Sequence, residues 1–149
     1  GIKVGLIAIL LDISKSFFPV YLAINYGINS YELIFICLAA ISGSIFSPFL
    51  KFKGSKSLSV TCGIWLAISS GVIGPLMCLM MAFSHLIQKT HIWTILFGWI
   101  GILIWVLIFS FALEFIVIYL INFILVMYKH RKELNQKIIF RNWINERKA

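Results

Sequence analysis

The sequence predicts an all-α fold, a polytopic bundle of transmembrane helices, and two observations support this prediction. Of 149 residues, 61% are hydrophobic and 12% are charged, and the mean hydropathy is +1.00. A soluble domain of this size needs a polar shell that such a composition cannot supply. Uncharged runs long enough to cross about 30 Å of hydrocarbon also recur along the chain. We therefore expect a transmembrane domain of about six spans over residues 1–128 and a basic tail over residues 129–149.

Charged residues interrupt the first expected span and bound the second. The first covers residues 4–23 and contains Asp12 and Lys15, and the second covers residues 33–50. Asp12 and Lys15 are three residues apart on one helix, so they share a face and can form an ion pair. Ionisable residues inside a span usually face the protein interior or a wet cavity. Two interpretations stay open: the pair lines the vestibule of an active site, or it is a neutralised pair that braces the bundle.

The third and fourth spans come from one long run. Residues 58–88 contain no Lys, Arg, Asp or Glu and would form about 46 Å of helix at 1.5 Å per residue. This is too long for one ordinary crossing. The segment Gly71-Val-Ile-Gly-Pro75 lies near the middle, where proline and glycine favour a turn. We expect two short spans, over residues 58–70 and 75–88.

The last two spans also come from one run. Residues 90–128 carry a single formal charge, Glu114, and are too long to cross the membrane only once. We place the reversal at residues 110–114, although this stretch contains neither glycine nor proline. The expected spans cover residues 92–109 and 114–128.

The distribution of basic residues decides between five and six spans. The formal net charge is +8, and seven of the thirteen Lys and Arg residues lie in the tail. Six spans place Lys3, the loop from Lys51 to Lys56, Lys89 and the tail on one face, which the positive-inside rule identifies as cytoplasmic. Five spans would put the tail across the membrane from the other lysines. We therefore expect both ends of the chain on the cytoplasmic side.

Several classes of function are excluded by composition. Nucleic-acid binding needs a soluble basic face, which the chain lacks outside its short tail; the basic residues suit anionic lipid headgroups instead. The three cysteines have no paired spacing, and no set of residues has the pattern of a metal site or a nucleophilic triad. We expect no metal and no cofactor. Within the tail, residues 138–144 suggest either an interfacial helix or a disordered segment.

Two clusters have the chemistry of an anion site. The loop after the second span supplies charge, hydroxyl groups and a glycine that permits close backbone approach; its residues are Lys51, Lys53, Gly54, Ser55, Lys56 and Ser57. Ser57 precedes an apolar helix as a natural N-cap, and the free N–H groups of that first turn favour an anion. The second cluster is His130 and Arg131, which could bind phosphate or shuttle protons. The alternatives are an ordinary cytoplasmic loop and a membrane-exit anchor.

Three segments, taken in order, resemble the bacterial acyl-phosphate:glycerol-3-phosphate acyltransferases, an integral membrane family often called PlsY. Residues 1–6 and 10–20 are similar to its G-K-x-G-x and L-L-D-x-x-K-G-x-x-P-V motifs. Residues 43–57, Gly-Ser-Ile-Phe-Ser-Pro-Phe-Leu-Lys-Phe-Lys-Gly-Ser-Lys-Ser, are similar to G-H-x-F-P-x-F-L-K-F-K-G-G-K-G. Residues 128–133, Tyr-Lys-His-Arg-Lys-Glu, are similar to x-x-H-R-x-N.

The resemblance implies a function and a site. Members transfer a fatty acyl group from acyl phosphate to the 1-hydroxyl of glycerol 3-phosphate, giving lysophosphatidic acid at the bacterial plasma membrane. They need no covalent protein nucleophile, which suits a site that works by positioning and charge neutralisation. It implies catalytic roles for Lys56 and His130. Phosphate-binding roles fall to Lys53, Gly54, Ser55, Ser57, Ser44 and Arg131. For Asp12 and Lys15, a vestibule role stays one of the two interpretations given above.

The chain also departs from the family motifs. Ser44 replaces a histidine, Ser57 replaces a glycine, and Glu133 stands at the position of an asparagine, where a carboxylate is expected to repel phosphate. A complete member would have seven spans and an upstream loop resembling S-G-N-P-G-A-T-N. These departures keep an alternative open: a catalytically inactive relative that binds lipid or a protein partner. An unrelated small transporter is a further alternative, which would need polar residues along several spans.

Overall fold

The computed structural model describes residues 2–46, 57–109, 112–136 and 139. Over these residues the chain forms six α-helices, which are α1 (Ile2–Asn25), α2 (Ser30–Ile45), α3 (Leu58–Ile68), α4 (Ile73–Ile87), α5 (His91–Phe109) and α6 (Leu113–His130). Each overlaps one of the six expected spans. The all-α class and the order of the helices are therefore confirmed.

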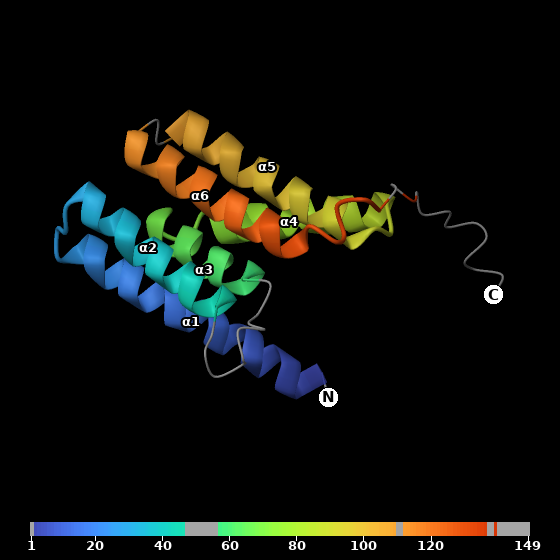
Figure 1. Cartoon of the computed structure of the whole chain (residues 1–149), viewed down its shortest axis with the longest axis horizontal. Helices are drawn as coiled ribbons and strands as arrows, with labels where there is room; N and C mark the ends of the chain where they lie inside the picture. The colour runs from blue at the N-terminus through green and yellow to red at the C-terminus, as the bar shows by residue number, and fades with distance from the viewer. Residues whose placement is uncertain (1, 47–56, 110–111, 137–138, 140–149) are drawn as a thin grey trace.

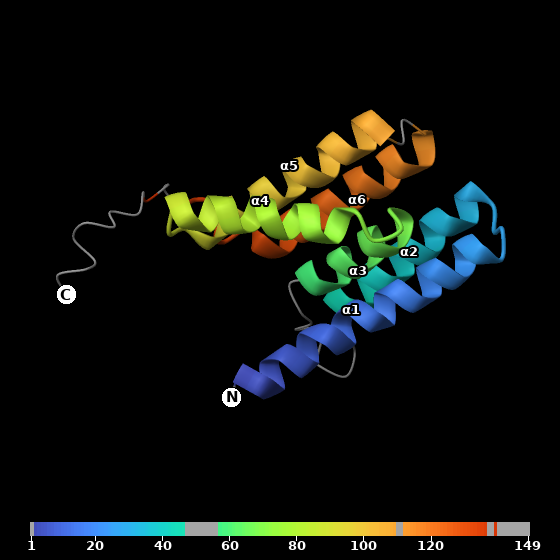
Figure 2. The same cartoon turned by 180° about the vertical axis from the view of Figure 1, so that it is seen from behind.

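The helices lie side by side in alternating directions (Figures 1 and 2). The helix α1 packs against α2 and α3, α4 packs against α5, and α2 joins the two groups by packing against α6. One end of the bundle contains the end of α6 and the beginning of α5; we call it the His130 end. The other contains the beginnings of α2 and α6; we call it the Glu114 end. The start of α1 and the end of α6 both lie toward the His130 end.

Helix length varies around what a bilayer requires. Among the described helices, α1, α5 and α6 are long and apolar enough to cross a membrane. The helices α2, α3 and α4 have 16, 11 and 15 residues and are shorter than the roughly 20 residues of an ordinary span. The six expected spans are thus present as six helices, of which three reach full length.

The two expected reversals occur where predicted. The helix α3 ends at Ile68 and α4 begins at Ile73, and Gly71 between them has a φ of +96°, a conformation that glycine adopts easily. Pro75 is the third residue of α4, where its missing N–H group costs little. The second reversal lies between Phe109 and Leu113.

The largest difference from the predicted boundaries is at the end of the second span. The helix α2 ends at Ile45 rather than continuing through residue 50, and Phe46 follows it with a ψ of 34°. The sequence gives the reason, since Pro48 disfavours helical geometry at the residue before it. Residues 47–50 lie outside the described part of the chain.

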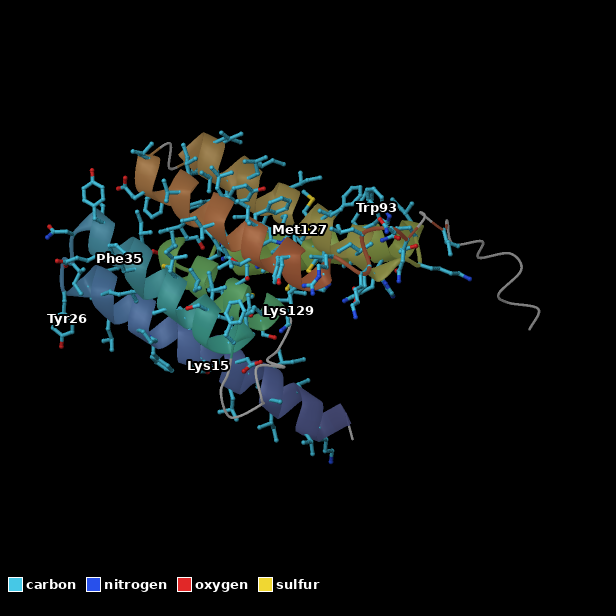
Figure 3. All side chains as sticks on the ribbon, in the orientation of Figure 1. Lys15, Tyr26, Phe35, Trp93, Met127 and Lys129 are labelled. Carbon is cyan, nitrogen blue, oxygen red and sulfur yellow. The ribbon has the colours of Figure 1, made fainter. Side chains whose placement is uncertain are left out.

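The lipid-facing surface and the core are both apolar. The beginning of α1 projects beyond its neighbours (Figure 1), and Val4 and Leu11 there are exposed. Exposed side chains such as Tyr26 point away from the bundle (Figure 3). Such a surface suits a bilayer, because lipid favours apolar side chains as well as a protein core does.

The core contains one polar pair that joins two helices. The Thr61 hydroxyl of α3 donates a 3.0 Å hydrogen bond to Oδ1 of Asn122 on α6. Both side chains are fully buried. The rest of the core consists of apolar side chains of several helices, including Ile41, Ile64 and Trp65.

Candidate functional site

The predicted site residues divide into those that the structure describes and those that it does not. Lys53, Gly54, Ser55 and Lys56 lie outside the described residues, so their roles stay predictions. The described ones are Ser44, Ser57, His130, Arg131, Asp12 and Lys15. The first four lie at the His130 end, at the end of α2, the start of α3 and the end of α6.

Three of these polar side chains are buried. Ser44 is 6% exposed, and Ser57 and His130 are each 1% exposed. A hydrogen bond joins the ends of α2 and α6. The Lys129 ammonium of α6 donates it, at 3.2 Å, to the Ile45 carbonyl at the end of α2. A cation suits a helix C-terminus, where carbonyl groups lack helical partners. The end of α2 that carries Ser44 is therefore held against the end of α6 that carries His130.

His130 is held by a carboxylate. Its Nδ1 atom lies 3.0 Å from Oε2 of Glu133, and the Glu133 amide donates a 2.8 Å hydrogen bond to the His130 carbonyl. The ring packs 6.4 Å from the ring of His91, centroid to centroid. Its Nε2 atom is buried and has no hydrogen-bond partner among the described residues. This nitrogen is the atom of His130 that is left for a ligand.

Ser57 occupies the N-cap position of α3, as predicted, but not in the expected way. Its carbonyl accepts a 2.9 Å hydrogen bond from the Thr61 amide, which starts the helix. Its φ of 59° and ψ of 13° place it in the left-handed region, and its side chain makes no capping hydrogen bond. A capping hydroxyl normally needs an extended backbone at that residue. The prediction of a hydroxyl cap is thus wrong, and the conformation is one that glycine prefers.

Arg131 faces outward. Its guanidinium lies 4.4 Å from the centre of the Tyr128 ring and donates a 3.1 Å hydrogen bond to the Tyr128 carbonyl. Tyr128 is exposed, so this arrangement turns the guanidinium away from the buried residues of the site. A phosphate-binding role for Arg131 requires its side chain to turn around the end of α6.

Asp12 and Lys15 form the predicted ion pair. The Lys15 ammonium lies 2.5 Å from Oδ1 of Asp12, and their side chains are 53% and 30% exposed. The pair joins two residues of one helix. On the adjacent face of α1, Ile13 and Ser16 meet Gly63 of α3 so closely that a Cβ at Gly63 would clash with both. Beside the ion pair, α1 and α3 therefore approach each other closely through Ser16, the backbone of Ile13 and Gly63.

His91 also lies beside the site, although none of the motifs includes it. It begins α5, and a small hydrogen-bond network fixes the preceding turn. The Gln88 amide donates to the hydroxyls of Ser84 and Thr94, at 3.2 and 2.8 Å, and its oxygen accepts from the Thr90 amide at 2.7 Å. The predicted topology does place His91 on the same face as His130. Only the folded packing shows that the two rings meet.

The chain beyond α6 folds back over this turn. The Lys89 amide donates a 2.8 Å hydrogen bond to the Ile139 carbonyl, and the Trp93 indole donates at 3.2 Å to the Gln136 carbonyl. A cavity of about 480 Å³ lies between the two segments, lined by Lys89, Thr90, His91, Gln136 and Ile139. Together with Lys129 and Arg131, Lys89 gives the described part of the His130 end an excess of positive charge. Such a surface favours anionic ligands.

Comparisons with known proteins identify the same family as the motifs. A family model described as "Glycerol-3-phosphate acyltransferase" matches residues 1–139. Glycerol-3-phosphate acyltransferase 1 of Thermotoga maritima is 31% identical over 152 residues, covering 91% of this chain and 74% of the relative. The glycerol-3-phosphate acyltransferase of Aquifex aeolicus is 28% identical over 155 residues, covering 91% and 71%.

A solved structure shows the same fold. The crystal structure of PlsY (YgiH), an integral membrane glycerol 3-phosphate acyltransferase in its lysophosphatidic acid form, superposes with a TM-score of 0.78 at 24% identity. The match covers 89% of this chain and 68% of that one. The helical architecture predicted from composition is therefore confirmed. From the extent of the family match and the similarity to the Thermotoga relative, the chain belongs to the glycerol-3-phosphate acyltransferase family.

Proposed function

We propose that the protein transfers a fatty acyl group from acyl phosphate to the 1-hydroxyl of glycerol 3-phosphate and forms lysophosphatidic acid. One observation supports this most directly: the described motif residues Ser44, Ser57 and His130 are buried at one basic end of the bundle. Both proposed substrates carry a phosphate group. A basic, partly water-excluded site holds such groups more strongly than a solvated surface does.

The proposed reaction needs no protein nucleophile. The glycerol hydroxyl oxygen bonds to the acyl carbonyl carbon, and the bond from that carbon to the phosphate oxygen breaks. The phosphate leaves with the bonding electrons and takes up the hydroxyl proton. The chain's task is therefore to hold two anions together, and bringing reactants together lowers the barrier substantially. Lys56 neutralises phosphate charge, and His130 reaches a phosphate oxygen through Nε2.

Both ends of the chain are proposed to face the cytoplasm, where these water-soluble and lipid-like substrates meet. The support is the charge pattern, since Lys3, Lys89 and Lys129 all lie toward the His130 end. Residues 16–50, 57–84 and 92–128 contain no Lys, Arg or His. The described residues of the Glu114 end all fall within these ranges. This asymmetry follows the positive-inside rule.

A direct assay tests the proposal. The full protein, purified in detergent and checked for helical content, is incubated with palmitoyl phosphate and radiolabelled glycerol 3-phosphate, and lysophosphatidic acid is measured. We expect product that requires both substrates and saturates with each. Lys56→Ala should abolish turnover, whereas Lys132→Ala, at the variable position of the last motif, should retain it. No product above background from folded protein would refute the proposal.

A non-catalytic relative is the second candidate, and the motif departures Ser44 and Glu133 favour it. Such a protein would keep the fold and bind glycerol 3-phosphate or anionic lipid without turnover. The same preparation decides between the two, because calorimetric binding of glycerol 3-phosphate without product formation supports only this candidate. A saturable requirement for glycerol 3-phosphate in acyl transfer excludes it.

A further inference from the structure

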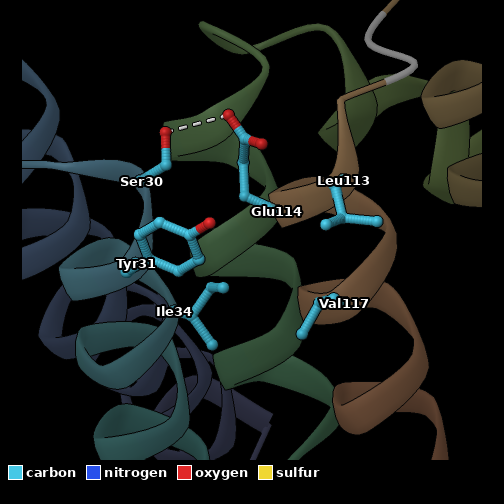
Figure 4. Close-up of a pocket in the computed structure, with 6 residues that line it drawn as sticks. All are labelled: Ser30, Tyr31, Ile34, Leu113, Glu114 and Val117. Atoms are coloured by element: carbon cyan, nitrogen blue, oxygen red, sulfur yellow. Dashed lines mark hydrogen bonds between the residues drawn. The ribbon is translucent and has the colours of Figure 1, made fainter.

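A second polar cavity lies at the Glu114 end, far from the site described above. It has a volume of about 210 Å³ and lies between the beginnings of α2 and α6 (Figure 4); its lining residues are Ser30, Tyr31, Ile34, Leu113, Glu114 and Val117. The Ser30 hydroxyl donates a 2.9 Å hydrogen bond to Oε1 of Glu114. A water molecule occupies about 30 Å³ of liquid volume, so the cavity has room for a small polar group.

Among the described residues, the charge of Glu114 has no cationic partner at this end. Residues 16–50, 57–84 and 92–128 contain no Lys, Arg or His, while Glu32 and Glu114 are both acidic. A carboxylate beside hydrocarbon is costly unless a positive group accompanies it. The start of α6 supplies only about half a positive charge from its aligned peptide groups. The cavity is therefore complementary to one cation.

The lining indicates which kind of cation fits. Magnesium and calcium ions prefer six or more oxygen ligands, and one carboxylate with one hydroxyl falls well short of that number. Tyr31 adds an aromatic ring, which attracts ammonium groups, and Ile34 and Val117 add aliphatic walls. Tyr31 and Leu113 are 75% and 69% exposed, so the cavity borders the lipid. We propose that it binds the ammonium headgroup of a phosphatidylethanolamine lipid.

Binding is measured without turnover, so the result is independent of the acyltransferase proposal. The full protein in detergent is titrated with dioleoyl phosphatidylethanolamine, its N-acetylated derivative and dioleoyl phosphatidylglycerol, and retained lipid is counted by native mass spectrometry. N-acetylation removes the ammonium charge and leaves the rest of the lipid unchanged. We expect phosphatidylethanolamine to bind at least fivefold more tightly than either other lipid. Equal affinity for all three lipids would overturn the proposal.

Two glutamate variants locate the site. Glu114→Gln removes the charge but keeps an oxygen that can accept from Ser30, and it should abolish the preference for phosphatidylethanolamine. Glu32→Gln is the matched control, because Glu32 also lies in a first helical turn at this end but does not line the cavity; it should keep the preference. If Glu114→Gln keeps it, the proposal fails. If Glu114→Gln does not fold, Tyr31→Leu replaces it in the test. Tyr31→Leu should weaken the binding of phosphatidylethanolamine at least twofold, and unchanged binding would also refute the proposal.

Discussion

The Nδ1 atom of His130 lies 3.0 Å from Oε2 of Glu133, while its Nε2 atom is buried with no partner among the described residues. A carboxylate on one ring nitrogen fixes the orientation and tautomer of the ring. At this position the family motif has an asparagine. In this chain the carboxylate that was expected to repel phosphate instead forms a pair with the histidine expected to bind it.

We therefore expect Glu133→Ala to impair acyl transfer through His130. Without the carboxylate the imidazole loses its support, and the rate should fall by about tenfold, the lower end of the effect of removing a supporting group from a functional histidine. The measurement is kcat for lysophosphatidic acid formation, with His130→Ala as the reference for complete loss. Glu133→Asn is the informative control, because it introduces the family residue. A faster rate in Glu133→Asn would mean that the carboxylate opposes phosphate binding.

Ser57→Gly should stabilise the protein. Ser57 has a φ of 59°, and a left-handed backbone costs a residue with a Cβ roughly 1 kcal/mol. Glycine avoids this cost, although it loses more entropy on folding, so we expect a net gain of about 0.5 kcal/mol in the free energy of unfolding. Unfolding in detergent, followed by tryptophan fluorescence, measures the change.

The matched control for that substitution is Ser42→Gly. Ser42 lies inside α2, where the backbone is helical and its hydroxyl bonds the Leu38 carbonyl at 2.6 Å. Glycine in a helix interior is unfavourable, so this variant should lose about 0.5 kcal/mol. If both variants change stability in the same direction, the strain assigned to Ser57 is wrong.

Much of the fold could be predicted because a membrane restricts its spanning helices to apolar segments of limited length. Charge-free runs identify the helices, and the combination of Gly71 with Pro75 identifies a reversal that length alone demanded. The expected span over residues 58–70 extends two residues past the observed end of α3 at Ile68, because counting charges does not separate Ser69 and Ser70 from the helix. There the positive φ values of Ser70 and Gly71 end the helix.

The site was less predictable than the fold. Motif spacing identified His130, but its contacts with Glu133 and His91 depend on how α6 ends and where α5 begins. The motif comparison considers each position separately, so the charge of Glu133 suggested only that it repels phosphate. It did not show that His130, one helical turn earlier, is the partner of this carboxylate. An i, i+3 inspection of the last turn would have found this pair.

Gly63 should tolerate no side chain. A Cβ there would meet the Ser16 hydroxyl and the backbone carbonyl of Ile13, and a backbone atom cannot move aside without shifting α1. We expect Gly63→Ala to destabilise the protein by about 1–3 kcal/mol, the usual cost of overpacking. Gly43→Ala is the control, since nothing lies within 4 Å of a Cβ at that helical position. That variant should be neutral or stabilised by up to about 1 kcal/mol, and equal losses in both would contradict the assigned contact between α1 and α3.

The buried pair of Thr61 and Asn122 should show a measurable coupling. Thr61→Val keeps the shape of the side chain and removes the donor, which leaves Oδ1 of Asn122 without its 3.0 Å hydrogen bond. Interhelical hydrogen bonds in membrane proteins contribute about 0.6 kcal/mol on average and up to about 1.7 kcal/mol. Full burial of both side chains favours the upper part of that range, because an unpaired amide finds no water there.

A double-mutant cycle isolates this contribution. Asn122→Leu alone should lower the free energy of unfolding by less than Thr61→Val does. The Thr61 hydroxyl that it leaves without a partner can still donate to a backbone carbonyl one turn earlier in the chain. Thr61→Val combined with Asn122→Leu removes both polar groups together, so no orphaned amide is left and part of the loss should be recovered. Unfolding by SDS in mixed micelles, followed by the fluorescence of Trp65 and its neighbours, measures all four proteins. We expect a coupling energy of about 1 kcal/mol, and additive losses would show that the hydrogen bond does not hold α3 to α6.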